Sequence, residues 1–135
     1  MCINTSDFDP SYFAIRFRTQ DTAIIWPASF VIISAHATTG QVWSAEKNVE
    51  ADQLLHTDLL KRNLAPIRII PYVPETGHAE PSWAVEMPLT EALDLGRDFH
   101  QDAIFSVRGD VLRVAHCNPP EQWVDVGTFR ERLTA

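Results

Sequence analysis

The stretch "AIFSVRGDVLRVAHC", residues 103–117, gives the strongest local indication of structure in this sequence. Two apolar, β-branched runs flank Gly109 and Asp110, a pair that is typical of a two-residue β-hairpin turn of type II′ or I′. Such a turn sets the register of the hairpin, so Arg108 should lie opposite Val111. One face of the hairpin is then wholly apolar, and we expect it to belong to the core: Phe105, Val107, Leu112 and Val114.

Apolar patterns upstream of this hairpin predict five more strands. These segments are residues 12–17, 22–26, 30–37, 67–73 and 82–87. We expect the first two to pair with each other as a hairpin. The third is apolar on both faces at its start, as in a central strand that is covered on both sides. Pro71 lies inside the fourth and indicates an edge strand or a β-bulge, because proline has no N–H to donate.

Helix signals occur in three places. Ser44 is a good N-cap for a helix that should end near Asn63, with an apolar stripe made of Ala51, Leu55 and Leu59. Thr90 can cap a second helix, whose stripe is Ala92, Leu95, Gly96 and Phe99. Near the C-terminus, Thr128 and Glu131 stand at the spacing of a capping box, which predicts the start of a short helix.

The expected order of elements is β-β-β-α-β-β-α-β-β. Hairpin connections dominate this order, so it predicts an α+β domain of two layers, with two main helices on one face of a mostly antiparallel sheet. With 135 residues we expect one domain over residues 1–135, whose core is about residues 12–117. The tail, residues 118–135, has an apolar side that either folds back onto the domain or binds a partner: Trp123, Val126, Phe129 and Leu133.

The composition argues against several classes of function. The net charge is -7 and no run of cations exceeds the pair Lys61-Arg62, so we predict no nucleic-acid partner. No apolar run approaches the ~20 residues of a membrane span, so we predict no membrane partner. Cys2 and Cys117 form no metal-type pair, and we interpret them as reduced thiols of a cytoplasmic protein. We also predict no metal and no cofactor, because the five histidines show no metal-ligand spacing and phosphate-binding motifs are absent.

Three polar residues lie where the pattern otherwise predicts core. Asn48 begins the apolar stripe of the first helix, and a buried amide without a partner would cost ~1–3 kcal/mol. It should therefore bond a loop backbone, a water or a ligand. Glu80 and Ser82 point to the same side of a strand entrance. Glu80 could act as a general base, bind a cation or hold a backbone amide, whereas Ser82 lacks the strained turn of a hydrolase serine.

A second polar group lies at the junction between the second helix and the last hairpin. His100 there is close to a helix C-terminus, where the dipole favours a partly charged imidazole. Gln101 could bind an amide-like or nucleobase-like edge, or it could cap a helix carbonyl. His36, near the end of the third predicted strand, and His100 are candidate proton carriers because imidazole titrates near neutral pH.

Taken together, these motifs resemble the domain of unknown function 3293 family of small bacterial proteins. The matching pieces span most of residues 12–117 and are "SAHAT" at 34–38, Ser44 with Asn48, Glu80-Pro81-Ser82 and Phe99-His100-Gln101. Two departures stand out, because Ala37 and Thr38 replace an Asn-Pro pair and His100 replaces a glycine. The resemblance implies no activity. It does imply that four polar residues belong together: Asn48, Glu80, Ser82 and Gln101.

Two hypotheses on function follow, and both leave open whether the protein is an enzyme. The first is a polar small-molecule site where two helix ends meet the sheet. In it Glu80 and His100 are the candidate catalytic residues, and the ligand-binding candidates are His36, Asn48, Ser82 and Gln101. The second is a protein-interaction or immunity-type module, whose acidic surface and apolar tail contact a partner or a second copy in a homodimer. The sequence identifies neither the ligand nor the partner.

Overall fold

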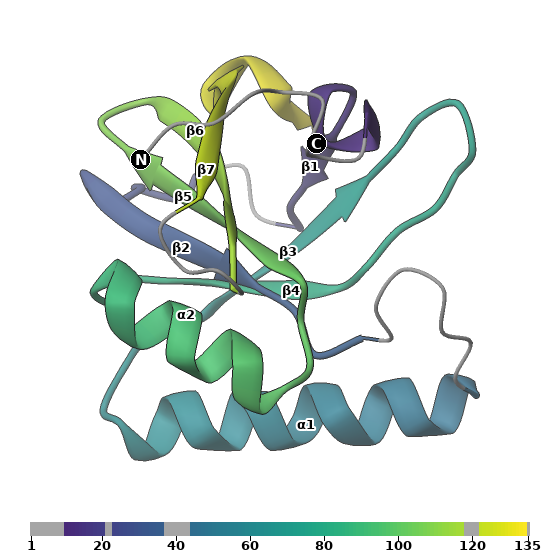
Figure 1. The fold of residues 1–135 in the computed structure, drawn as a ribbon, viewed down its shortest axis with the longest axis vertical. Coiled ribbons are helices and arrows are strands. Elements are labelled where there is room, and N and C mark those ends of the chain that lie inside the picture. Colours follow the sequence, from purple (N-terminus) through teal and green to yellow (C-terminus); the bar gives the residue numbers. More distant parts are fainter. Residues whose placement is uncertain (1–9, 21–22, 37–43, 118–121, 135) are drawn as a thin grey trace.

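The computed structural model of the protein describes residues 10–20, 23–36, 44–117 and 122–134. Eight strands form one mostly antiparallel sheet in the order β7-β6-β5-β2-β4-β3-β1-β8 (Figure 1). The strands are β1 (Arg16–Arg18), β2 (Ser29–Ile33), β3 (Ile67–Tyr72), β4 (Ser82–Val85), β5 (Ala103–Arg108), β6 (Val111–His116), β7 (Trp123–Thr128) and β8 (Leu133–Thr134). The helices are α1 (Ala45–Lys61) and α2 (Leu89–Asp98), with short 3₁₀ helices η2 (Pro10–Phe13) and η3 (Arg130–Arg132). In these ranges no helix has the length and apolar character needed to cross a membrane.

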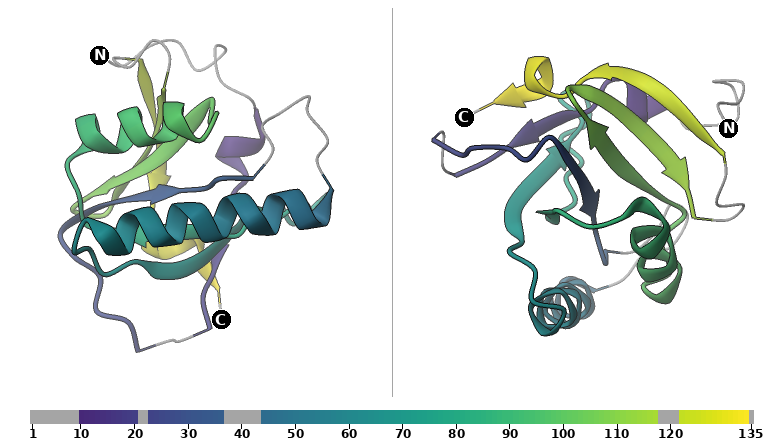
Figure 2. Two further views of the ribbon diagram at one scale, coloured as in Figure 1. Left: turned by 90° about the horizontal axis from the view of Figure 1, so that it is seen from below. Right: turned by 90° about the vertical axis from the view of Figure 1, so that its left-hand side faces the viewer.

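Both α-helices pack against the same face of the sheet, and the chain has the α+β class that the sequence predicts (Figure 2). Leu55 and Leu59 of α1 are fully buried there, together with Ile33 of β2. Helix α2 approaches the end of β6 so closely that a Cβ on Gly96 would lie 2.7 Å from the Cys117 sulfur. A glycine is therefore required at this point of α2.

The other face of the sheet curls around a second core, seen end-on in the right-hand view of Figure 2. Its centre is a set of packed rings, which we call the aromatic core: Phe17, Trp26, Phe30, Phe105 and Phe129. Their ring centroids lie 5.0 to 5.3 Å apart in five contacts, most of them edge-to-face. Such pairs contribute ~0.5–1.5 kcal/mol each beyond the area that they bury.

The hairpin at residues 103–117 is confirmed in detail. Arg108 pairs with Val111, and the ladder runs without a shift to Ala103 and His116. Gly109 has a φ of 65°, whereas Asp110 does not have a positive φ. Only the first central residue of the turn is left-handed, which is the pattern of a type II′ turn.

Local signals also predict α1 correctly. The hydroxyl of Ser44 accepts a hydrogen bond from the Lys47 N–H at 3.1 Å, as an N-cap does. At the other end Asn63 adopts a left-handed φ of 61°, and the Leu64 N–H donates to the Leu59 carbonyl at 3.2 Å. This is the Schellman arrangement that ends many helices.

Two expectations for the N-terminal strands are wrong. Residues 23–28 form no strand in the described chain, because Trp26 turns its ring into the aromatic core instead of pairing with a neighbour. The strand expected over residues 12–17 shrinks to β1, since η2 occupies its first part. Strand β1 then pairs with β3 and β8 and not with a hairpin partner.

The capping and edge signals around β3 and α2 are also incorrect. Strand β3 has neighbours on both sides, so Pro71 is not on an edge; its carbonyl accepts the Glu80 N–H at 3.1 Å. Helix α2 begins after Pro88 without a side-chain cap, and Thr90 lies inside its first turn.

The C-terminal segment folds back onto the domain. Residues 123–128 form edge strand β7, so the helix expected from Thr128 is reduced to the single turn η3. Phe129 is buried in the aromatic core. The Arg132 guanidinium donates to the Phe13 and Ile15 carbonyls at 3.0 and 2.9 Å and to the Val126 carbonyl. One side chain therefore joins β7 to the segment that precedes β1, across the opening of the curled sheet.

Candidate functional site

The end of β2 and the start of β4 lie together at one end of the sheet, on the right of Figure 1. Ile33 is the register partner of Trp83, and β3 joins them because Ile69 pairs with Ser82. His36 follows the last paired residue of β2, and Glu80 precedes the first of β4. The sheet register therefore carries both side chains to the region where these strands end.

His36 is half-buried in this region, and its backbone is held at both ends. Its N–H donates to the Ser34 hydroxyl at 3.0 Å, and its carbonyl accepts the Gln101 side-chain amide at 2.8 Å. Within the described residues the ring nitrogen Nδ1 is buried and has no hydrogen-bond partner. Burial lowers the pKa of His36 below its ordinary value of 6.5, against the opposing charges of Asp52 and Glu80. A neutral imidazole with an unused nitrogen is the result.

An ion pair joins α1 to the sheet beside this histidine. Asp52 is buried, with 9% of its surface exposed, and the Arg68 guanidinium donates to its two oxygens at 2.6 and 3.0 Å. The guanidinium carbon also lies 3.7 Å from the centre of the Trp83 ring, and the ring of His56 stacks on Trp83 at 4.1 Å. The indole N–H of Trp83 is buried without a partner among the described residues. We call His36, Asp52, Arg68, Glu80 and Trp83 the polar site.

The sequence reasoning missed Asp52, Arg68 and Trp83 as site residues. A signal for Asp52 was present, because it stands in the buried stripe of α1 with Leu55 and Leu59, where a charge needs a partner. Nothing in the sequence identified Arg68 as that partner, since the two residues meet only through the packing of α1 on β3.

Glu80 and Ser82 lie at the start of β4, and their side chains contact different groups. The Glu80 carboxylate is about one-third exposed and lies 3.2 Å from the Nε2 atom of His78. Ser82 is almost fully buried, and its hydroxyl donates to the Glu80 carbonyl at 2.7 Å. Ser82 therefore holds the backbone that positions Glu80, which is a structural role.

Gln101 makes the backbone contacts expected of a capping residue. Its side-chain amide donates to the carbonyls of His36 and Phe99, so it ties the exit of α2 to the end of β2. His100 is exposed and has a φ of 60°. The His100 N–H donates to the Arg97 carbonyl and the Gln101 N–H donates to the Gly96 carbonyl, which completes a Schellman motif. His100 thus occupies the left-handed position that glycine favours.

Asn48 lies one turn before Asp52 on the same face of α1 and is partly buried. Residues 37–43, in the loop before α1, lie outside the described residues. They include Ala37 and Thr38, where this chain departs from the Asn-Pro of the family pattern. Within the described ranges no group of three or more His, Cys, Asp or Glu side chains is placed to hold a metal ion.

A family model described as "Protein of unknown function (DUF3293)" matches residues 33–104, which is more than half of the chain. The chain belongs to the DUF3293 family. The family segment runs from the end of β2 to the first residues of β5, so it contains the whole polar site and both α-helices. Residues outside the family segment make up much of the aromatic core. They also make the Arg132 bridge, as we call the three bonds from Arg132 that join β7 to the segment before β1. Neither the curated proteins nor the solved structures contain a significant match to this DUF3293 chain.

The structure shows what one departure from the Phe-Gly-Gln pattern costs. In place of the glycine this chain has His100 in a left-handed conformation, which costs a non-glycine residue on the order of 1 kcal/mol.

Proposed function

We propose that this protein binds a small polar molecule at the polar site. The observation that carries the proposal is the Nδ1 atom of His36, which is buried without a described partner on a ring that feels the charges of Asp52 and Glu80. Buried polar atoms in folded proteins are nearly always hydrogen-bonded, and the exceptions cluster where a ligand or catalysis uses them. Trp83, with its unpaired indole N–H, is a second exception in the same cluster.

The chemistry of the site indicates how a ligand would be held. A neutral His36 can accept one hydrogen bond and donate another. Glu80, which is partly exposed, can accept a proton or a hydrogen bond from the same ligand. Asn48 would add an amide contact from α1, while Ser82 and Gln101 keep Glu80 and His36 in place through their backbone bonds.

Catalysis is a further step in the proposal. Glu80 would serve as the general base, and His36 or His100 would carry the proton at near-neutral pH. The proposal needs no metal and no cofactor. We also place the protein in the cytoplasm, since Cys117 is a free and buried thiol.

The test is a thermal-shift screen of nucleotides, sugars, amino acids and common metabolites against the protein and two matched variants. Glu80→Gln removes the proposed ligand contact, and Glu75→Gln removes the same charge from an exposed position in the same loop. A ligand at 100 times its Kd stabilises the folded state by about 2.7 kcal/mol. We expect that shift in the unaltered protein and in Glu75→Gln, and we expect its loss in Glu80→Gln with little change in the ligand-free Tm.

The opposite result would identify the polar cluster as internal scaffolding. In that case no compound raises the Tm, and Glu80→Gln alone lowers it by several degrees. A second readout is the NMR titration of His36, because a bound ligand that uses Nδ1 must change the pKa of that ring.

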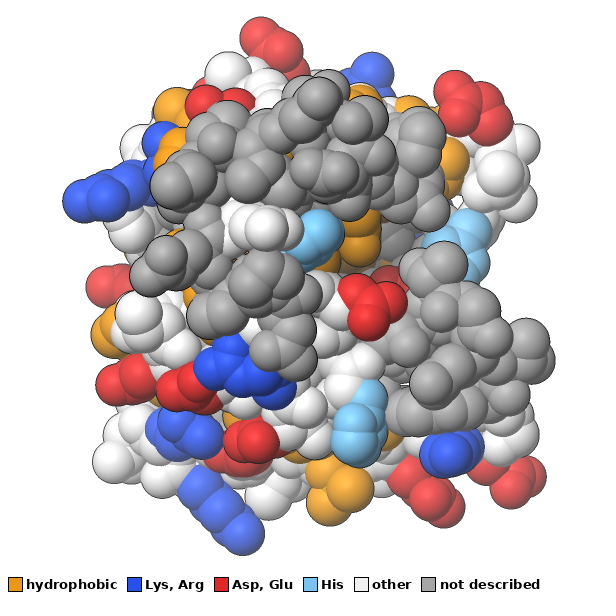
Figure 3. All heavy atoms as spheres, viewed as in Figure 1, with side chains coloured by type: hydrophobic (Ala, Val, Ile, Leu, Met, Phe, Trp, Pro, Cys, Tyr) orange, Lys and Arg blue, Asp and Glu red, His pale blue; other side chains and the backbone are white. Residues whose placement is uncertain are grey.

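The interaction-module hypothesis receives less support. Phe129 of the apolar tail is buried in the aromatic core, and Leu133 packs against it. The acidic surface that the hypothesis also invokes is spread over the visible face in Figure 3 and is not gathered into one patch. Deleting residues 119–135 would remove β7 along with the tail, so light scattering of the intact protein is the sharper test for a homodimer or a partner.

A further inference from the structure

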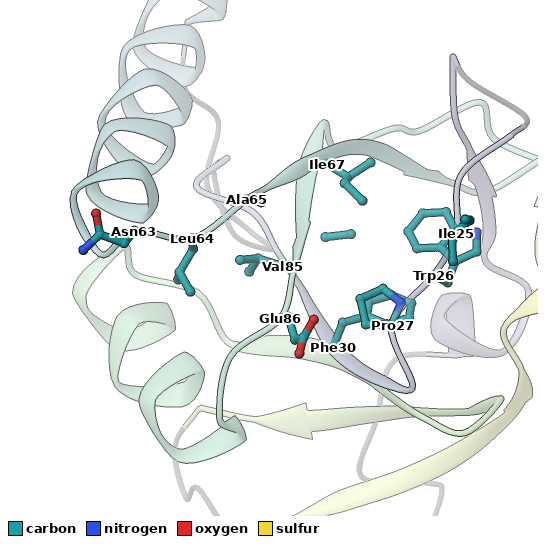
Figure 4. A pocket seen from close by; sticks show the side chains of 11 residues that line it. Ile25, Trp26, Pro27, Phe30, Asn63, Leu64, Ala65, Ile67, Val85 and Glu86 are labelled. Carbon is teal, nitrogen blue, oxygen red and sulfur yellow. The ribbon is translucent and has the colours of Figure 1, made fainter.

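A concave site lies at the opposite end of α1 from Asn48. It is an open pocket of about 410 Å³ between the segment before β2, the end of α1 and the strands β3 and β4 (Figure 4). That volume is within the usual range for small-molecule sites. None of its described lining residues belongs to the polar site.

The walls of this pocket are mostly apolar. Trp26, Phe30 and Pro27 stand on one side in Figure 4, and Leu64 stands on the other. Phe30 is buried, and Trp26 is held by a stacked contact with it at 5.2 Å and by an edge contact with Phe129 at 5.0 Å. The aromatic wall is therefore rigid before any ligand arrives, which lowers the entropic cost of binding.

One charge faces this apolar wall. Glu86 is the single charged residue among the described lining residues, and its carboxylate lies beside Phe30 in Figure 4. No ion pair in the described chain uses Glu86, unlike the carboxylates of Asp52, Asp58 and Asp125. The chain as a whole also carries a net charge of -7, which attracts cations and repels anions.

We propose that this pocket binds a small organic cation, an amine with an aromatic or alkyl body. The body would lie against Trp26, Phe30 and Leu64, and the ammonium group would face Glu86. The site is separate from the polar site, so the inference does not depend on the function proposed there.

The experiment compares three probes of the same shape that differ in charge: phenethylamine, 2-phenylethanol and 3-phenylpropionate. Each is titrated into the ¹⁵N-labelled protein at low salt, and the amide shifts of residues 25–30 and 84–86 report binding. We expect phenethylamine to bind up to about fivefold more tightly than the alcohol, because an exposed ion pair contributes at most ~1 kcal/mol. The carboxylate probe should bind most weakly.

Two variants decide the role of Glu86. Glu86→Gln should remove the preference for the amine and leave binding of the alcohol unchanged. Glu50→Gln, which removes an equal charge from an exposed part of α1 outside the pocket, should leave the preference intact. The proposal is overturned if the three probes bind equally, if Glu86→Gln keeps the preference, or if the shifts occur away from the pocket.

Discussion

The aromatic core and the polar site lie on the same sheet, but they differ in how far their groups are satisfied. In the aromatic core each ring packs on at least one other ring. At the opening of the curled sheet, the Arg132 guanidinium donates hydrogen bonds to three backbone carbonyls. In the polar site two buried ring nitrogens have no described partner. A third buried atom without a described partner, the Thr128 hydroxyl oxygen, lies at the end of β7 beside Phe129. The aromatic core is thus defined by ring packing, whereas two unpaired ring nitrogens occur together in the polar site, and this pair is the basis of the binding proposal.

The largest expected effect is in the aromatic core. Phe129→Ala removes a ring that contacts Phe17, Trp26 and Phe30, and it should lower the free energy of unfolding by about 3–5 kcal/mol. Urea denaturation measures the loss. Phe129→Leu keeps most of the volume and should cost clearly less. Equal losses in the two variants would show that ring packing does not stabilise this region.

The Arg132 bridge should come next. Arg132→Met keeps the apolar stem and leaves three carbonyls without their donor, for a loss of about 2 kcal/mol. Arg130→Met is the matched control, because the Arg130 side chain is exposed and the bonds described for this residue are made by its backbone: its N–H donates to the Asp110 carboxylate and its carbonyl accepts the Leu133 N–H. We expect the control to change stability by less than about 0.5 kcal/mol. A similar loss in both variants would contradict a closing role for Arg132.

The ion pair of the polar site should contribute less. Asp52→Asn breaks a bidentate pair that is partly shielded from water, and we expect a loss of about 1–2 kcal/mol. Asp58→Asn breaks the exposed pair with Arg62 on the same helix, which should cost only ~0.3–0.5 kcal/mol. Chemical denaturation of both variants at one salt concentration tests the difference. If Asp58→Asn is as costly as Asp52→Asn, burial does not distinguish the two pairs.

The smallest expected effect is a pH dependence that belongs to His36. Burial lowers the pKa of His36 in the folded state, so below pH 6.5 the unfolded chain binds a proton that the folded chain does not. The contribution of neutral His36 to the free energy of unfolding is therefore fully present above pH 6.5. It is lost as the pH falls through the pKa that His36 has in the folded state. We expect His36→Gln to flatten the decline in urea midpoint between pH 7.5 and 5.5. An unchanged slope in His36→Gln would contradict this contribution of His36.

Elements that depend on neighbouring residues were predictable from the sequence. The β5–β6 register follows from the Gly109-Asp110 turn, and the limits of α1 follow from Ser44 and from the residues before Pro66. In each case the deciding contacts are made within a few residues, where backbone geometry leaves few alternatives.

Only the tertiary structure decided how distant segments meet. Asp52 and Arg68 form a pair because α1 packs across β3, and Trp26 enters the aromatic core in place of forming a strand. The C-terminal segment becomes β7 because the curled sheet has an open edge beside β6. The order of strands and the packing of helices depend on many weak contacts formed at once, and no local pattern of residues specifies that sum. The sequence by itself therefore determined the β5–β6 turn, the limits of α1 and the α+β class, whereas the strand order determined that the unpaired nitrogens of His36 and Trp83 lie near the same strand ends.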